Sequence, residues 1–158
     1  MAEHVISVRR LCDGAQLPSY AHEDDAGADL VVVEDLSLQP GQRAVVGTGL
    51  AVAIPVGYAG MVFPRSGLAA RSGLTLVNSP GLIDAGYRGE IRLCLLNTDR
   101  HSPITLKRGD RVAQLVIQKV EHARFDEVDT LDSTDRGSGG YGSSGGVAGW
   151  QESSPTRQ

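Results

Sequence analysis

The chain has 158 residues, a formal net charge of −4, and a composition of 41% hydrophobic but only 4% aromatic residues. This length fits one domain, and the hydrophobic fraction lies far above that of disordered chains. The negative charge argues against a general nucleic-acid-binding protein, and no apolar run reaches the ~18 residues of a membrane-spanning helix. We therefore expect neither a nucleic-acid partner nor a membrane.

The two cysteines, Cys12 and Cys94, offer neither a disulfide framework nor the paired spacing of a zinc site. The sequence begins Met-Ala-Glu-His, with no basic stretch and apolar segment of the kind that forms a secretory signal. These features predict reduced thiols and a cytoplasmic location.

Apolar residues recur with a period of two along most of the chain, which is the pattern of half-buried strands. Strands are predicted at 5–8, 30–33, 44–54, 61–63, 74–77, 91–95, 104–106 and 113–118. Turn-forming pairs such as Pro40-Gly41 and Pro80-Gly81 separate them, and the second pair predicts a hairpin between its flanking segments. One short helix is expected near 67–71. Many short strands at this spacing favour an all-β sandwich or barrel of the jelly-roll type.

The composition changes near Ser133, because residues 136–150 read RGSGGYGSSGGVAGW and contain seven glycines. Such a stretch buries too little apolar surface to offset its ordering entropy. We therefore predict a domain over residues 1–132 and a flexible tail over 133–158. An RNA-binding role for this tail is a weak alternative, since it contains a single Arg-Gly pair in a chain of net negative charge.

Four further clusters carry polar chemistry: DDAGADL at 24–30, PRSG at 64–67, NSPGLIDAGYRGE at 78–90 and RGDRVAQ at 108–114. Taken singly, each also fits an ordinary turn, and Asp84 in particular suits a turn residue that bonds its own backbone. The Arg-Gly-Asp string at 108–110 is interpreted as a β-turn rather than an adhesion motif.

In sequence order, the segments DAGADL, PRSGLA, GLIDAGYRGEI, RGDRVAQL and RGSGGYGSSG resemble the five motifs of the homotrimeric dUTPase family over roughly residues 5–146. The resemblance implies a jelly-roll-like (β-clip) fold and a homotrimer. It also implies three active sites at subunit interfaces, each built from motifs of more than one chain and closed by the glycine-rich tail.

The activity implied by the resemblance is hydrolysis of dUTP to dUMP and pyrophosphate, which keeps uracil out of DNA and supplies dUMP for thymidylate synthesis. Asp84 matches the general base that activates water for in-line attack on the α-phosphorus. Tyr87 is expected to pack against the deoxyribose and leave no room for a 2′-hydroxyl.

Substrate contacts are implied for further residues. Asn78 and the backbone of Leu82, Ile83 and Asp84 would read the uracil edge. The phosphates would be held by Arg65, Ser66, Gly67 and Gln114 from the body of the domain, and by Arg136, Gly137 and Ser138 from the tail. Tyr141 would stack on the uracil, in place of the phenylalanine of many members. Arg92 is expected in the pocket, with a backbone contact as the alternative because this position is often apolar in the family.

Magnesium is the expected cofactor. Because Mg²⁺ keeps several waters and takes phosphate oxygens readily, we expect no direct protein ligand and a water-mediated contact from Asp29.

Two other functions fit the same fold. A deoxycytidine triphosphate deaminase would call for Arg-Ser-Ser and a catalytic glutamate, whereas this chain has Arg65-Ser66-Gly67. A catalytically inactive nucleotide sensor is disfavoured by the presence of Asp84.

Overall fold

The computed structural model describes residues 5–140, which divide into two units between His122 and Ala123. Every helix and strand of the described residues belongs to the first unit. In chain order they are β1 (Ser7–Arg10), β2 (Ala28–Val31), β3 (Leu36–Leu38), β4 (Arg43–Ala53), β5 (Tyr58–Pro64), α1 (Ser66–Ser72), β6 (Leu74–Leu76), β7 (Gly81–Ile83), β8 (Glu90–Asn97), β9 (Ile104–Leu106) and β10 (Arg111–Lys119).

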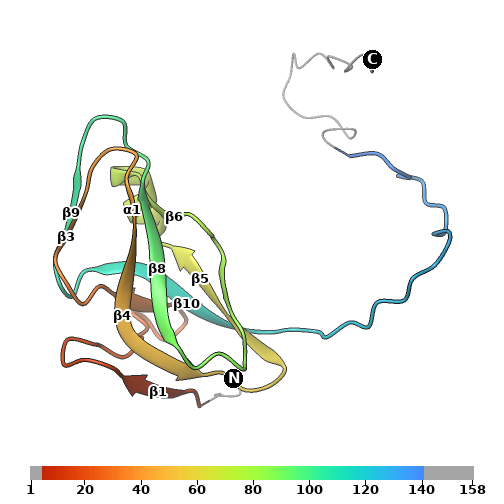
Figure 1. Cartoon of the computed structure of the whole chain (residues 1–158), viewed down its shortest axis with the longest axis horizontal. Helices are drawn as coiled ribbons and strands as arrows, with labels where there is room; N and C mark the ends of the chain where they lie inside the picture. The colour runs from red at the N-terminus through yellow and green to blue at the C-terminus, as the bar shows by residue number, and fades with distance from the viewer. Residues whose placement is uncertain (1–4, 141–158) are drawn as a thin grey trace. The chain divides into compact units, whose positions relative to one another are not determined.

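The strands form two four-stranded sheets and one two-stranded ribbon, all antiparallel. The first sheet has the order β1-β4-β8-β6, the second β2-β10-β5-β7, and the ribbon pairs β3 with β9. Figure 1 shows the long strands β4 and β8 side by side in the first sheet, with β10 and β5 in the second. The result is the predicted all-β, jelly-roll-like architecture.

The hydrophobic core draws side chains from both sheets and from the ribbon. Strand β8 illustrates how the sequence produces it, because Ile91, Leu93 and Leu95 are buried while Glu90 and Arg92 lie on the opposite, more open face. This alternation follows from the period of two along a strand. With few aromatic residues available, the core is built from leucine, isoleucine, valine and alanine.

A buried amide joins the end of β8 to its surroundings. Asn97 is fully buried, and its Nδ2 donates to the carbonyl oxygens of Leu38 (3.0 Å) and Ser102 (2.9 Å). Its Oδ1 accepts the main-chain N–H of Asp99 at 2.9 Å. The side chain therefore ties the first sheet to the β3–β9 ribbon and to the loop after β8.

Most of the predicted elements are present, and the differences are local. The strand expected at 5–8 begins at Ser7, the one expected at 30–33 ends at Val31, and the short helix extends to Ser66–Ser72. Helix α1 ends at Gly73, whose φ of 71° allows the left-handed conformation that terminates it. Strands β3 and β7 were not predicted.

The predicted hairpin around Pro80-Gly81 is wrong. Strand β6, before this turn, pairs with β8 in the first sheet, whereas β7, after it, pairs with β5 in the second. The turn therefore carries the chain from one sheet to the other, and in each sheet the short strand pairs with a longer neighbour.

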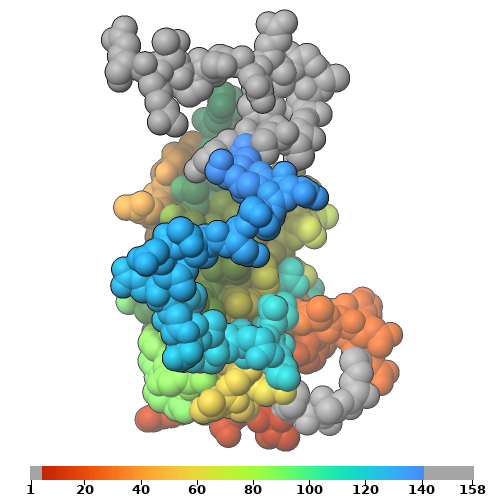
Figure 2. Space-filling model, turned by 90° about the vertical axis from the view of Figure 1, so that its right-hand side faces the viewer, coloured from red at the N-terminus to blue at the C-terminus, as the bar shows by residue number. Residues whose placement is uncertain are grey.

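Residues 123–140 of the second unit contain no helix or strand. They follow an irregular path that includes a turn at residues 135–138 and are drawn in blue shades in Figure 2. None of them contributes to the hydrophobic core. In the described part of the chain, the single helix has seven residues, and no helix there could cross a membrane.

Candidate active site

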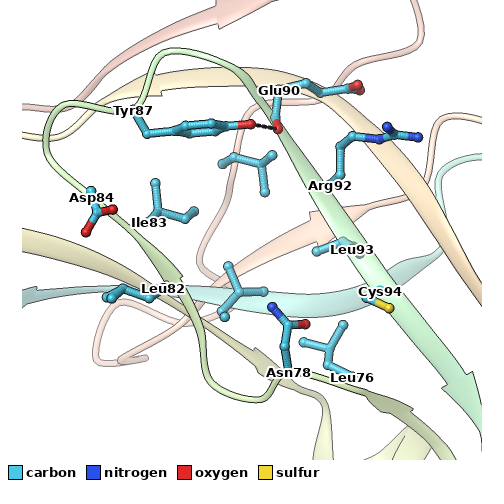
Figure 3. A pocket seen from close by; sticks show the side chains of 13 residues that line it. Leu76, Asn78, Leu82, Ile83, Asp84, Tyr87, Glu90, Arg92, Leu93 and Cys94 are labelled. Carbon is cyan, nitrogen blue, oxygen red and sulfur yellow. Dashed lines mark hydrogen bonds between the residues drawn. The ribbon is translucent and has the colours of Figure 1, made fainter.

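A cavity of about 200 Å³ opens where β7 and the turn after it meet β8. Figure 3 shows the Tyr87 ring and the Asn78 side chain on opposite sides of this cavity, with Asp84 at its edge. Its lining comprises Val62, Leu76, Asn78, Gly81, Leu82, Ile83, Asp84, Tyr87, Glu90, Ile91, Arg92, Leu93 and Cys94. We call this cavity the Asp84 pocket. It brings together all the predicted site residues of the third motif, together with Arg92.

Asp84 directly follows β7, and its carboxylate is exposed. Its main-chain carbonyl accepts the N–H of Tyr87 at 3.0 Å, which closes the turn. Among residues 5–140, no hydrogen bond or ion pair engages the carboxylate itself. The side chain is therefore not used to build the turn, and both oxygens are available to a water molecule or a ligand hydroxyl.

Tyr87 is held at two points. Its hydroxyl donates to the main-chain carbonyl of Glu90 at 2.9 Å, as the dashed line in Figure 3 marks. Its ring lies against Gly89, because a Cβ at that position would fall 2.6 Å from the ring atom Cζ. Tyr87 is 45% exposed, so the rest of the ring is open to a ligand.

Strand β7 lines the pocket and lies at the edge of its sheet. It is the last strand of the second sheet and pairs only with β5 there, so its other edge retains free N–H and C=O groups. Ile83 is buried in the core and Leu82 is 60% exposed. This geometry agrees with recognition through the backbone of residues 82–84.

A second cavity, which we call the Arg65 pocket, lies between α1 and the segment before β2. It is lined by Ala21, His22, Asp25, Ala26, Gly27, Asp29, Arg65, Ser66, Gly67, Leu68, Arg71 and Gln114. The predicted phosphate residues Arg65, Ser66, Gly67 and Gln114 are thus assembled in one place. Gln114 is oriented by a hydrogen bond from its Nε2 to the carbonyl of Pro64 at 3.2 Å.

Asp29 is a buried carboxylate that holds the guanidinium group of Arg65 in this pocket. Its Oδ1 lies 3.0 Å from Nε of Arg65, and its Oδ2 lies 3.1 Å from Nη1 of Arg111. Asp29 is only 7% exposed, whereas the Arg65 side chain remains 31% exposed. A buried charge needs such partners, and the pairing leaves part of the Arg65 guanidinium facing the pocket.

The Asp84 and Arg65 pockets share no lining residue. A single chain therefore divides the predicted site into two parts, one with the candidate base and one with the candidate phosphate ligands.

The tail residues Arg136, Gly137 and Ser138 belong to the second unit and are described only within it. There, the Arg136 Nε donates to the carbonyl of Gly139 at 3.0 Å, and the N–H of Gly137 donates to the carbonyl of Thr134 at 3.0 Å. Tyr141 lies outside the described residues. The roles of these four residues stay predictions.

The described residues contain no group of three or more histidine, cysteine, aspartate or glutamate side chains that could hold a metal ion. Among the described residues that line the Arg65 pocket, Asp29 is the one buried carboxylate, and both of its oxygens already contact guanidinium groups. Its water-mediated contact with magnesium stays a prediction.

The structure adds pocket residues that the sequence interpretation did not select. Glu90 and Cys94 line the Asp84 pocket, and His22 and Arg71 line the Arg65 pocket. The strand period could have indicated the first two, since both share the face of β8 that carries Arg92. Arg71 follows Gly67 by one helical turn, and its Nε donates to the Gly67 carbonyl at 3.2 Å.

The chain is similar to known dUTPases along most of its length. The family model for dUTPase matches residues 13–145. The deoxyuridine 5′-triphosphate nucleotidohydrolase of Thermobifida fusca is 60% identical over 149 residues, which cover 94% of this chain and 83% of the relative. The protein of the same name from Nocardia farcinica is 59% identical over 143 residues, covering 90% and 87%.

Solved structures show the same fold. The Staphylococcus bacteriophage 80alpha dUTPase with dUpNHpp superposes with a TM-score of 0.83 and 30% identity, covering 90% of this chain and 99% of that one. A dUTPase from phage phi11 of S. aureus, described with a structural Mg(II) ion, has a TM-score of 0.76 and 29% identity, covering 82% and 100%. The chain therefore belongs to the dUTPase family.

Proposed function

We propose that this protein hydrolyses dUTP to dUMP and pyrophosphate, with the magnesium complex of dUTP as its substrate. The observation that carries the proposal is the exposed Asp84 carboxylate, which no described residue engages, at the edge of a pocket that also contains Tyr87 and Asn78. The family relationship supports the same activity, since the relatives named above are dUTP hydrolases.

In the proposed reaction, Asp84 accepts a proton from a water molecule as the water oxygen attacks the α-phosphorus in line. The bond between the α-phosphorus and the bridging oxygen to the β-phosphate breaks, and pyrophosphate leaves with that oxygen. Magnesium offsets the phosphate charge as part of the bound substrate. Arg65 would hold phosphate oxygens from a fixed position, because Asp29 restrains its Nε.

We also propose that the base is recognised at the edge of β7. The free backbone groups of residues 82–84 and the Asn78 amide would pair with uracil, and this close contact would exclude the methyl group of thymine and the reversed donor pattern of cytosine. Tyr87 would lie against the deoxyribose and reject a 2′-hydroxyl. Arg92 is open to solvent at the same pocket and is proposed as a further contact.

The separation of the two pockets supports a homotrimer in which the Asp84 pocket of one subunit faces the Arg65 pocket of another. The tail, with Arg136, Gly137, Ser138 and Tyr141, would then close over this shared site and exclude water. We propose the cytoplasm as the location of the reaction, which would limit dUTP and supply dUMP there.

The test is pyrophosphate release from dUTP, dTTP, dCTP and UTP, each with and without magnesium. Of the four nucleotides, we expect only dUTP to release pyrophosphate rapidly, and only when magnesium is present. Release of ammonia from dCTP, or equal turnover of all four nucleotides, would contradict the proposal.

A further inference from the structure

The first residue of β8, Glu90, contacts the site residue Tyr87 through its main chain. The Glu90 carbonyl accepts the Tyr87 hydroxyl at 2.9 Å, and Figure 3 shows this bond spanning the top of the pocket. The ring also lies directly on Gly89, where any Cβ would overlap the phenol oxygen. The position of the Tyr87 ring therefore follows the path of the backbone at residues 89 and 90.

The carboxylate of Glu90 reaches in the other direction, to an irregular part of β4. The pairing of β4 with β8 shifts register between Gly47 and Ala51, which marks a β-bulge. Within it, Gly49 has a φ of 67°, and its N–H donates to Oε1 of Glu90 at 2.8 Å. The carboxylate thus supplies the acceptor that regular pairing would otherwise provide.

The bulge is shaped to receive this carboxylate. A Cβ at Gly47 would overlap Oε1 of Glu90, so the side chain occupies the space that a larger residue would fill. Next to it, the buried Thr48 hydroxyl donates to the carbonyl of Ile91 at 2.7 Å. The start of β8 is therefore held against the bulge by two hydrogen bonds. In one, a β8 side chain accepts from the β4 backbone, and in the other, a β4 side chain donates to the β8 backbone.

We propose that Glu90 is a positioning residue for Tyr87 and thereby sets the discrimination of this site against ribonucleotides. By anchoring the start of β8 to the β4 bulge, its carboxylate fixes the carbonyl that holds the Tyr87 hydroxyl. The ring is then held where a 2′-hydroxyl would collide with it. This inference rests on the proposed function of the Asp84 pocket, and it adds a residue that acts through Tyr87.

The test compares Glu90→Ala with Glu90→Gln, measuring kcat and KM for dUTP and UTP separately. Glutamine keeps an acceptor for the Gly49 N–H, whereas alanine leaves that donor without one. We expect Glu90→Ala to lower the ratio of kcat/KM for dUTP over UTP by about tenfold, mainly through improved relative use of UTP. Glu90→Gln should keep the ratio close to that of the wild type.

Two controls separate positioning from general damage. Glu34→Ala removes an exposed glutamate outside both pockets and should leave the ratio unchanged. Asn97→Ala weakens the fold at the opposite end of β8 and should reduce stability without altering the ratio. The inference would be overturned if Glu90→Ala left the ratio of kcat/KM for dUTP over UTP unchanged. It would also be overturned if Glu90→Gln or Asn97→Ala lowered that ratio as much as Glu90→Ala does.

A readout without catalysis distinguishes this inference from the proposed function. In crystal structures without nucleotide, we expect the bond from the Tyr87 hydroxyl to the residue 90 carbonyl to be lost in Glu90→Ala and kept in Glu90→Gln. An intact bond in Glu90→Ala would overturn the positioning role even if the wild type hydrolyses dUTP. Conversely, a wild type that does not hydrolyse dUTP would contradict the proposed function regardless of the Tyr87 position.

Discussion

Two aspartates of the predicted site have opposite surroundings, and this difference separates their roles. Asp29 is buried and contacts Arg65 and Arg111 through separate oxygens. Asp84 is exposed and engages no described partner through its carboxylate. A carboxylate whose two oxygens both contact guanidinium groups has neither oxygen free to hold a water molecule, whereas an open carboxylate can orient water. The surroundings therefore favour Asp84 as the base and Asp29 as the group that positions Arg65.

The substitution Asp84→Asn tests the first role. It keeps the size of the side chain and removes its ability to accept a proton, so nucleotide binding and folding should change little while kcat falls by about 10²–10⁴-fold. Single-turnover hydrolysis and equilibrium binding of dUTP measure the two effects separately. Activity above a tenth of the wild-type value would place the base elsewhere.

Tyr87→Ala tests how the sugar is recognised. Removing the ring opens space beside the deoxyribose, so the efficiency for UTP relative to dUTP should rise by about ten- to a hundredfold. The efficiency for dTTP should rise less, because the extra methyl group would be excluded by the backbone of residues 82–84. Competition assays with paired nucleotides measure both ratios. Equal relaxation toward UTP and dTTP would mean that Tyr87 only supports the turn.

At the scale of secondary structure, the sequence predicted the longer strands well because their alternation is visible over many residues. The eleven residues of β4 and the nine of β10 are examples. Three-residue strands are too short to show a clear period, and of the four described strands of this length the sequence predicted β6 and β9 but not β3 and β7. The predicted hairpin at Pro80-Gly81 failed for a related reason. Turn residues indicate where the chain reverses, but they do not determine which strands pair with each other.

The residues of the candidate site also divide into those that the sequence could identify and those that it could not. Motif residues such as Arg65 and Asp84 could be selected from the sequence, because their order along the chain resembles a known family. The part played by Glu90 could not, since it depends on a bulge in β4 that lies about forty residues away in the sequence.

Asn97→Ala should be the most costly polar substitution within the β8 region. It removes three hydrogen bonds and leaves two carbonyls and one N–H without their partner, so unfolding free energy should fall by about 2–4 kcal/mol. Chemical denaturation at fixed protein concentration measures this loss, with Thr105→Ala on the exposed face of β9 as control. A loss below about 0.5 kcal/mol would show that water replaces these bonds freely.

Truncation before Arg136 tests the tail. No residue after Ile117 in the described part of the chain belongs to the core or packs against it, so thermal stability without nucleotide should stay within about one degree of the full chain. Turnover should fall by about a hundredfold or more, because the proposed phosphate contact of Arg136 and the closure of the site are lost. Tyr141→Phe in the full chain is the matched control, and it should be almost silent because phenylalanine keeps the ring that would do the proposed stacking. A truncated protein with normal kcat would show that the tail is only a linker.

At the scale of the whole molecule, the central feature is that one chain carries two incomplete pockets. The Asp84 pocket offers a base and groups suited to a nucleoside, and the Arg65 pocket offers cations and amides suited to phosphates. Neither alone accounts for hydrolysis of a triphosphate. The proposed association, in which one pocket faces the other, would account for both the division within the chain and the distribution of the site over several motifs.

Mixing two inactive variants tests this claim most directly. Asp84→Asn and Arg65→Ala each damage a different pocket, so each homotrimer should be nearly inactive. When the two are refolded together in equal amounts and form mixed trimers, about a quarter of the shared sites should combine an intact Asp84 with an intact Arg65, and about a quarter of wild-type activity should return. Light scattering confirms that the mixture is trimeric. If the mixed trimers stay as inactive as either parent, both residues serve the site within one chain and the shared-site account is contradicted.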